Sequence, residues 1–192
     1  MGQPRILAFA GSLRKDSYNK KLAIVSAEAA TAAGAHVTLI DLRDYQLPLY
    51  DGDLEAASGH PPASHALKQL FYDHQGLLLA CPEYNSSMTG VFKNTIDWVS
   101  RPLPGEVANI AFQNKLVTLL STAPGALGGL RGLVHVRSML SNIGAIVLPG
   151  QLAIPKSPEA FTASGKLADS RQQASVEKLA ANLAGMIERF HR

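Results

Sequence analysis

The stretch ILAFAGSLRKDSYNKKLAIV, residues 6–25, contains the pattern that decides the fold. Its first residues, Ile6–Ala10, are an unbroken apolar run, which is typical of a strand buried on both faces of a parallel sheet. A glycine-led loop follows, and a helix is predicted to start near Ser17. The apolar residues of that helix recur at helical spacing: Leu22, Val25, Ala29 and Ala32. A strand, a tight loop and a helix in this order predict an α/β fold.

Four further apolar runs of strand length follow, and they alternate with segments of helical period. The runs are Val37–Ile40, Leu77–Cys81, Leu116–Leu120 and Ala145–Leu148. The helical segments are Ala66–Asp73, Val91–Val99, Leu133–Ile143 and Val176–Phe190. Right-handed crossovers between parallel strands leave few topologies for this alternation. We therefore expect a flavodoxin-like, doubly wound, five-stranded parallel sheet of order 2-1-3-4-5, with helices on both faces.

One segment resists this assignment. Residues 43–64 contain three prolines and two glycines, and no regular structure is predicted there. A loop of this length inside a compact domain is uncommon unless it is functional. We expect a surface excursion that ends before the helix at Ala66–Asp73.

The composition limits the classes of protein to be considered. A chain of 192 residues with 46% apolar and 17% charged residues is expected to form a single globular domain, residues 1–192. No apolar run is long enough to cross a bilayer. The single cysteine, Cys81, excludes an internal disulfide framework and favours a reducing cytoplasm. The net charge of +3 comes without a dense basic tract, so nucleic-acid binding is not expected.

The ligand site of an open α/β sheet lies beyond the carboxyl ends of the strands, where the winding direction reverses. For the order 2-1-3-4-5 this point lies between the first and third strands. The loop after the first strand combines a tight turn, a helix start and short polar side chains. Backbone N–H groups at a helix start favour an anion, and an arginine fork suits phosphate oxygens. The candidate phosphate ligands are Ser12, Arg14, Ser17 and Asn19. An ordinary helix start capped by Ser17 fits the local sequence equally well.

The loop after the third strand begins at Pro82. Tyr84 can lie along a planar aromatic ligand, whereas the carboxylate of Glu83 needs a partner in such a place. The alternative is a polar turn before a helix capped by Ser87 or Thr89.

The loop after the fourth strand, Ser121–Gly132, contains four glycines, which let the backbone pack closely against a flat ligand. Arg131 in this loop could bind a phosphate. The alternative is a flexible connection and an ordinary helix start. Each loop alone is a weak signal, but three such loops at the carboxyl ends of adjacent strands predict one ligand cleft.

Four motifs occur in order between Met1 and about Pro155: GSLRKDSYNKKLA, DLRDYQLPLYDGDLE, PEYNSSMTGVFKNTIDWVSR and STAPGALGGLRG. Together they resemble the NADPH-dependent FMN reductase family, which includes enzymes described as quinone, chromate and azo-dye reductases. The resemblance implies the flavodoxin-like fold, bound FMN, NADPH or NADH as electron donor, and a homodimer or homotetramer. Residues 156–175 match the family less clearly, so the resemblance implies no role for them. The loop Arg101–Asn114 is longer than expected for the family.

The resemblance also implies roles for residues. The FMN phosphate would be held by Ser12, Arg14, Ser17 and Asn19. The isoalloxazine ring would be lined by Pro82, Glu83, Tyr84 and Asn85. Ser121 and Gly125 would lie on the other side of the flavin. Because the flavin carries the electrons, no catalytic side chain and no metal ligand are predicted.

Three functions remain open at this stage. The first is a flavoenzyme that passes electrons from NAD(P)H through FMN to a quinone, an azo compound, free flavin or a metal oxyanion. The second is an electron carrier of flavodoxin type that serves protein partners, but such carriers tend to be strongly acidic and this chain carries +3. The third is a flavin-free regulator on the same fold, which would need acidic residues at the ends of the first and third strands, where none stand.

Other reactive side chains have simpler interpretations. Lys93 and Asp97, four residues apart in one helix, are expected to form a surface ion pair. His60 and His65 are expected to be solvated, because their spacing matches no metal site. Cys81 is expected to be a buried, unreactive thiol.

Overall fold

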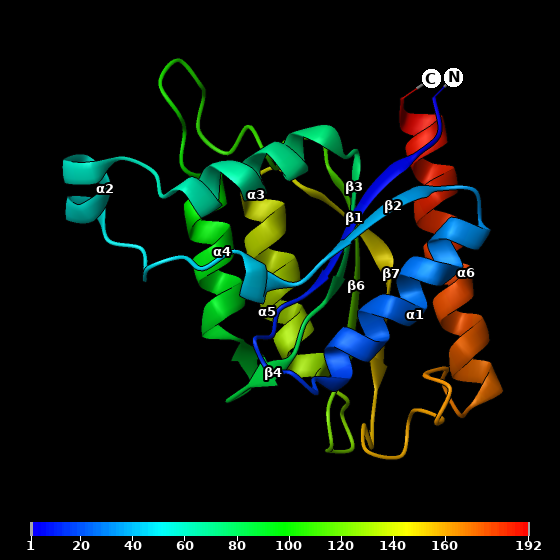
Figure 1. Ribbon diagram of the computed structural model, residues 1–192. Helices are drawn as coiled ribbons and strands as arrows, with labels where there is room; N and C mark the ends of the chain where they lie inside the picture. Colours follow the sequence, from blue (N-terminus) through cyan, green and yellow to red (C-terminus); the bar gives the residue numbers. More distant parts are fainter. Residues whose placement is uncertain (1, 192) are drawn as a thin grey trace.

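The computed structural model describes residues 2–191, in which five strands form one parallel sheet (Figure 1). The strands are β1 (Arg5–Ala10), β2 (His36–Ile40), β3 (Gly76–Ala80), β6 (Leu116–Thr122) and β7 (Ile146–Ile154). Their spatial order is β2-β1-β3-β6-β7, which confirms the predicted flavodoxin-like order 2-1-3-4-5. Because every neighbouring pair is parallel, the carboxyl ends lie together at the lower edge of the sheet in Figure 1.

Helices cover both faces of this sheet, as predicted. They are α1 (Tyr18–Ala32), α3 (Pro62–Asp73), α4 (Gly90–Ser100), α5 (Leu130–Asn142) and α6 (Ser170–Phe190). One face packs against α1 and α6, and the other packs against α3, α4 and α5 (Figure 1). Side chains of β1 alternate between the two cores: Ile6 and Ala8 face α1, whereas Leu7 and Phe9 face α3 and α4. Burial on both faces explains why this strand is apolar throughout.

Strand β7 continues to Ile154 and is longer than the predicted run Ala145–Leu148. Pro149 and Gly150 suggest the end of a strand, since proline cannot donate to the ladder and glycine weakens it. Here they accompany a shift of register with β6, and pairing resumes beyond it. An edge strand accommodates such an irregularity because only one neighbour is affected.

Residues 43–64 contain more regular structure than predicted. A short 3-10 helix, η1 (Leu42–Asp44), and the helix α2 (Gly52–Ser58) lie in or beside this segment, and α3 already begins at Pro62. The side chain of Asp51 caps α2 by accepting a backbone hydrogen bond at 2.9 Å. No residue of α2 is buried, so the sequence shows no apolar periodicity there. Figure 1 shows α2 projecting from the body of the protein.

A small hairpin, β4 (Glu83–Tyr84) and β5 (Ser87–Met88), follows β3 where an irregular loop was expected. Its turn residues, Asn85 and Ser86, both have positive φ values, 51° and 64°. A tight turn of type I′ requires this backbone at both central positions, and asparagine tolerates it better than most residues. Thr89 then caps α4, which confirms one of the two predicted caps.

The loop Arg101–Asn114 joins the end of α4 to the start of β6, at the edge opposite the carboxyl ends (Figure 1). It therefore does not form the rim of the predicted cleft. Lys68 of α3 is buried and holds the loop, with Nζ 2.6 Å from the Glu106 carboxylate. Tyr72 donates its hydroxyl to the same carboxylate at 2.5 Å. Burial would raise the pKa of Glu106, but hydrogen bonds from Lys68 and Tyr72 outweigh it and lower the pKa to about 2. Among the helices of residues 2–191, none is long and apolar enough to span a membrane.

Candidate functional site

A pocket lies at the carboxyl ends of β1 and β3, where the winding direction of the sheet reverses. Loops after β1, β3, β6 and β7 all contribute to its lining. Seven of the predicted site residues line it: Ser12, Arg14, Ser17, Asn19, Pro82, Glu83 and Tyr84. The convergence of separate loops expected from the topology is therefore present.

The N-terminus of α1 lies at this pocket without a side-chain cap. Ser17 occupies the N-cap position with an extended backbone, but its side chain makes no capping hydrogen bond. The first helical hydrogen bonds run from the N–H groups of Lys20 and Lys21 to the Ser17 oxygen. The N–H groups of Tyr18 and Asn19 precede these bonds, so they are available to a ligand. By contrast, side chains cap α2, α4 and α6.

Hydrogen bonds and close packing against α4 fix the loop between β1 and α1. Ser12 is buried, and its Oγ accepts a hydrogen bond from the N–H of Arg14 at 3.2 Å. The hydroxyl proton of Ser12 can therefore point to a ligand, while the Arg14 side chain is exposed. Gly11 lies so close to α4 that an added Cβ would come within 2.9 Å of Phe92 Cβ. Thr89 Oγ1 donates to the Gly11 oxygen at 2.7 Å and fixes this approach.

Asn19 is buried, and its side-chain amide joins α1 to the end of β6. Nδ2 donates to the backbone oxygen of Thr122 at 2.8 Å, and Oδ1 accepts from the N–H of Thr122 at 3.0 Å. The amide thus satisfies two buried backbone groups of a distant strand. Its use in this way leaves the backbone N–H as the group that Asn19 can offer a ligand.

The structure provides the partner that the Glu83 carboxylate requires. Nε and Nη2 of Arg131 donate to Oε1 at 2.9 and 2.6 Å, and the N–H of Gly132 donates to Oε2 at 3.0 Å. Burial would raise the pKa of Glu83, but the hydrogen bonds from Gly132 and Arg131 outweigh it and lower the pKa. Arg131, a candidate phosphate ligand in the sequence, instead binds Glu83 and braces the hairpin against α5.

Three predicted site residues lie outside the pocket lining. Ser121 is fully buried, and its Oγ donates to the backbone oxygen of Cys81 at 2.6 Å. Gly129 covers it so closely that an added Cβ would lie 2.0 Å from Ser121 Oγ. Gly125 is exposed in the loop after β6, and Asn85 is exposed at the tip of the hairpin.

Five lining residues escape the prediction from sequence: Tyr18, Thr122, Ala123, Pro124 and Ser157. Four of them lie in, or directly beside, loops that the topology already brings to the pocket. Ser157 is different, because it follows β7. The predicted strand ends at Leu148, so the sequence does not indicate that Ser157 lies near the site. The observed strand ends at Ile154, which places Ser157 at the carboxyl edge of the sheet.

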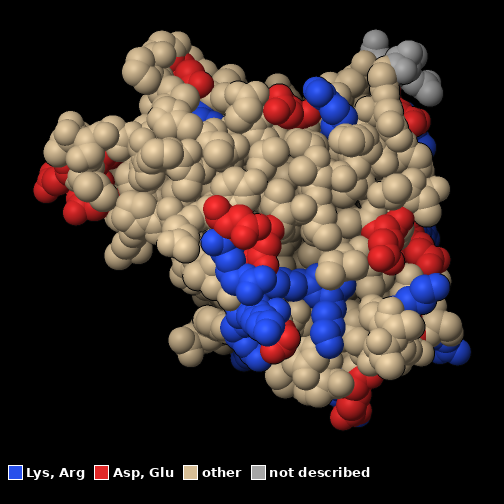
Figure 2. All heavy atoms as spheres, viewed as in Figure 1, with Lys and Arg blue, Asp and Glu red and all other residues tan. Residues whose placement is uncertain are grey.

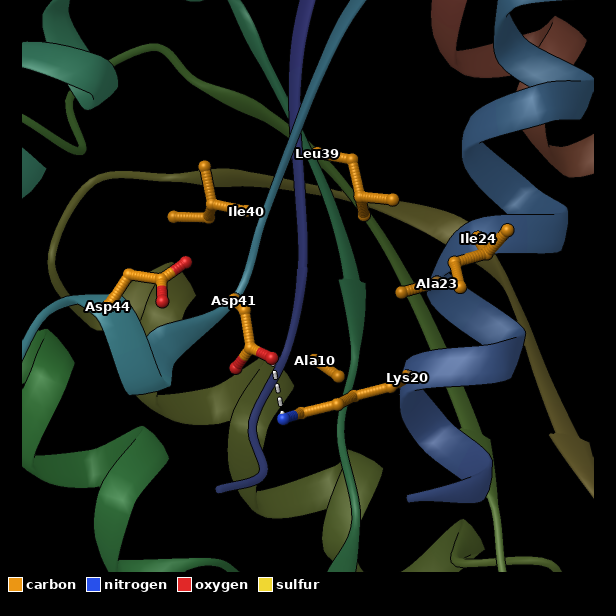
Figure 3. Close-up of a pocket in the computed structure, with 8 residues that line it drawn as sticks. All are labelled: Ala10, Lys20, Ala23, Ile24, Leu39, Ile40, Asp41 and Asp44. Carbon is orange, nitrogen blue, oxygen red and sulfur yellow. Dashed lines mark hydrogen bonds and ion pairs between the residues drawn. The ribbon is translucent and has the colours of Figure 1, made fainter. Parts of the chain in front are cut away.

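Basic side chains gather beside the pocket. Figure 2 shows Lys and Arg over the region that Figure 1 assigns to the start of α1 and η1. A second hollow opens there between α1 and the end of β2, with Lys20 Nζ 2.8 Å from Asp41 Oδ2 (Figure 3). Burial would raise the pKa of Asp41, but hydrogen bonds from Arg43 and Lys20 outweigh it and lower the pKa to about 2. Within this group of basic side chains, Lys20 and Arg43 are thus paired with Asp41.

The remaining reactive side chains have structural roles. Lys93 and Asp97 form the predicted ion pair at 2.5 Å. Cys81 is buried as predicted, and burial raises the pKa of its thiol. The prediction of a solvated His60 is wrong, because its side chain is 6% exposed and packs beside Trp98. Among residues 2–191, no group of three or more His, Cys, Asp or Glu side chains could hold a metal ion.

The family model described as NADPH-dependent FMN reductase matches residues 4–159. The chain belongs to this family. It is an oxidoreductase that uses FMN and NAD(P)H, so the expectations of enzyme class and cofactors are confirmed. An NAD(P)H-dependent FMN reductase of Pseudomonas aeruginosa is 34% identical over 175 residues, which are 91% of this chain and 90% of that protein. A 2-hydroxy-1,4-benzoquinone reductase of a Burkholderia species is 33% identical over 182 residues, 92% of this chain and 94% of the other.

Solved structures agree with this assignment. A flavoenzyme NAD(P)H:(acceptor) oxidoreductase from Paracoccus denitrificans is similar with a TM-score of 0.82 and 27% identity, over 97% of this chain and 98% of that one. A flavodoxin from the domain Archaea is similar with a TM-score of 0.62 and 8% identity, over 96% of this chain and 99% of that one. The second likeness concerns the fold alone.

Proposed function

We propose that the pocket at the carboxyl ends of β1 and β3 binds FMN, and that the enzyme passes electrons from NAD(P)H through it to a quinone. The observation that carries the proposal is the meeting, in one pocket, of an uncapped helix N-terminus, the Arg14 loop and an exposed aromatic side chain. Membership of the family makes FMN the ligand to test there.

The β1–α1 side of the pocket fits the phosphate group of FMN. The N–H groups at the start of α1 and the positive end of the helix dipole favour a dianion. The Ser12 hydroxyl and the Arg14 guanidinium would add donors, and we assign phosphate binding to them together with Ser17 and the backbone of Asn19. The basic side chains seen around this edge in Figure 2 would attract the anion.

The hairpin side of the pocket fits the ring system. Tyr84 is 53% exposed and can cover one face of a planar ligand, next to the buried Pro82. Glu83 also lines the pocket, and its ion pair with Arg131 balances the charge of the carboxylate and fixes the hairpin. FMN held between Tyr84 and the start of α1 would supply the redox chemistry that links NAD(P)H to the second substrate. The chain itself orients the reactants and supplies hydrogen-bond donors, so we assign no catalytic side chain.

The quinone acceptor is proposed because several relatives carry quinone reductase or quinone oxidoreductase names and align over most of the chain. Azo compounds, free flavin and metal oxyanions are further acceptors to test on the same enzyme. We propose no nucleic-acid or membrane partner. The lone, buried Cys81 supports a reducing cytoplasm as the compartment.

We also propose that residues 1–192 form one domain that assembles as a homodimer or homotetramer. Several large apolar side chains are exposed, including Leu49 at 82%, Val107 at 61% and Val134 at 57%. Each of these side chains is a candidate contact between copies, and the proposal itself rests on membership of the family. Light scattering on the eluting protein should give the mass of two or four chains, and a monomer at micromolar concentration would contradict this assignment.

The function is tested by spectroscopy of the protein loaded with FMN. We expect stoichiometric FMN, an oxidised-flavin spectrum, and bleaching when NADPH or NADH is added without oxygen, followed by return of colour when a quinone is added. Arg14→Ala should weaken FMN binding by about tenfold or more, because a charge-assisted hydrogen bond is lost. Arg189→Ala, which removes an exposed positive charge from the last turn of α6, is the matched control and should bind FMN normally.

Two results would contradict the proposal. A protein that takes up no FMN from an excess would rule out the site. Bound FMN that neither nicotinamide nucleotide reduces would favour a carrier of flavodoxin type.

A further inference from the structure

The segment after β7 supplies the pocket with a residue to which neither the family resemblance nor the neighbouring loops assign a role. Ser157 lines the pocket together with Ser12, Arg14 and Ser17. It is completely buried, and among the described residues its Oγ has no hydrogen-bond partner. Buried hydroxyl groups are almost always hydrogen-bonded, so an unpaired one on a residue that lines a ligand pocket indicates a ligand atom as the missing partner.

The backbone holds Ser157 in place. Its N–H donates to the oxygen of Ala123, in the loop after β6, at 3.1 Å. The preceding residue, Lys156, has a φ of 52°, in the left-handed region that non-glycine residues adopt infrequently. A sparsely populated backbone conformation next to a buried hydroxyl is common where structure is organised around a ligand.

The same segment also packs on the start of α1. The ring of Phe161 stacks on Tyr18, with 6.2 Å between centroids and an interplanar angle of 10°. The segment after β7 therefore forms a wall of the pocket beside the uncapped helix N-terminus. Ser157 and the first residues of α1 thus line the same pocket.

We propose that the Ser157 hydroxyl donates a hydrogen bond to a phosphate oxygen of bound FMN, as a phosphate ligand from the segment that follows the fifth strand of the sheet. This inference rests on the proposed function. Thr118 provides the internal comparison: its Oγ1 is also buried without a partner among the described residues, but it lies within β6 and does not line the pocket. An unpaired hydroxyl outside the pocket should not respond to FMN.

The test compares Ser157→Ala with Thr118→Val, in binding titrations with FMN and with riboflavin, which lacks the phosphate. Ser157→Ala should weaken FMN binding by about tenfold and leave riboflavin binding unchanged, as expected for one hydrogen bond to a charged group. Thr118→Val should change neither. The melting temperature of the FMN-free protein gives a second readout. It should stay equal or rise in Ser157→Ala, since an unpaired buried hydroxyl is removed, but fall below wild type when FMN is present.

Several outcomes would overturn the inference. If wild type binds FMN and Ser157→Ala keeps the same ratio of FMN to riboflavin affinity, Ser157 is not a phosphate ligand, although the proposed function stands. If the FMN-free variant melts well below wild type and both flavins bind more weakly by the same factor, the hydroxyl is structural. If wild type takes up no FMN, the proposed function fails as well. Ser157→Cys, which keeps the side-chain size, repeats the comparison should the alanine variant fail to fold.

Discussion

Replacing Asn19 by alanine removes two hydrogen bonds that join the start of α1 to the end of β6. Both partners are backbone groups of Thr122, which is buried and would be left unpaired. Each unsatisfied buried group costs about 1–3 kcal/mol, so we expect the loss of two bonds to lower the free energy of unfolding by about 2–6 kcal/mol. For a chain of this size the melting temperature should fall by roughly 4–24 °C.

The assay is urea unfolding of the FMN-free protein, followed by circular dichroism, with FMN binding measured separately. A side chain whose only task is to bind phosphate would leave the FMN-free protein unaffected. Ser17→Ala is the matched control, because Ser17 is also buried at the pocket but makes no side-chain capping bond. Its cost to the FMN-free protein should be less than about 1 kcal/mol.

A loss below about 1 kcal/mol in Asn19→Ala would refute the reasoning, since it would mean that water or a relaxed backbone satisfies Thr122. An unchanged m-value is needed for the comparison, because a change would indicate a different unfolded or native ensemble.

Two further predictions concern the scaffold around the site. Gly129 has a φ of +92°, and an added Cβ would lie 2.0 Å from Ser121 Oγ, so Gly129→Ala should lower the free energy of unfolding by about 3 kcal/mol. Gly125→Ala is the control, because its Cβ would meet no atom within 4 Å, and it should change the free energy of unfolding by less than about 0.5 kcal/mol. Equal losses in urea titrations would contradict the packing described. Glu106 has a folded pKa of about 2, below its ordinary 4.5, so it stabilises the fold above about pH 4.5 and this contribution disappears as the pH falls toward 2. Glu106→Gln should flatten the stability profile in that window, and an unaltered profile would show that the contact with Lys68 does not hold the loop in solution.

Most of the fold could be predicted from the sequence because its central strands are buried on both faces. Runs such as Ile6–Ala10 have no polar interruption, and such runs allow few topologies once they alternate with helices. The parts that could not be predicted lack that signal. Helix α2 buries nothing, so no periodicity marks it. The end of β7 lies beyond Pro149 and Gly150, which ordinarily mark a turn.

The candidate site divides in the same way. The topology predicted which loops meet, and seven of the ten expected residues line the pocket. The use of each short polar side chain could not be foreseen, because the partners of Asn19 and Ser121 are backbone groups of strands far away in the sequence. Ser157 could not be predicted as a site residue because the apolar run that marks β7 stops at Leu148, six residues before the strand ends at Ile154.

The irregular pairing of β7 also affects whether the sheets of two molecules could join edge to edge. Opposite the short stretch from Val117 to Leu119 on β6, β7 advances from Val147 to Gln151, with Pro149 between them. A strand of a second molecule could not pair regularly with the free edge of β7, because the register of β7 is interrupted and Pro149 has no N–H to donate. The β2 border has an even parallel register with β1 and is free of such a break. Continuation of the sheet into a second molecule is therefore blocked on one side and depends on β2 on the other.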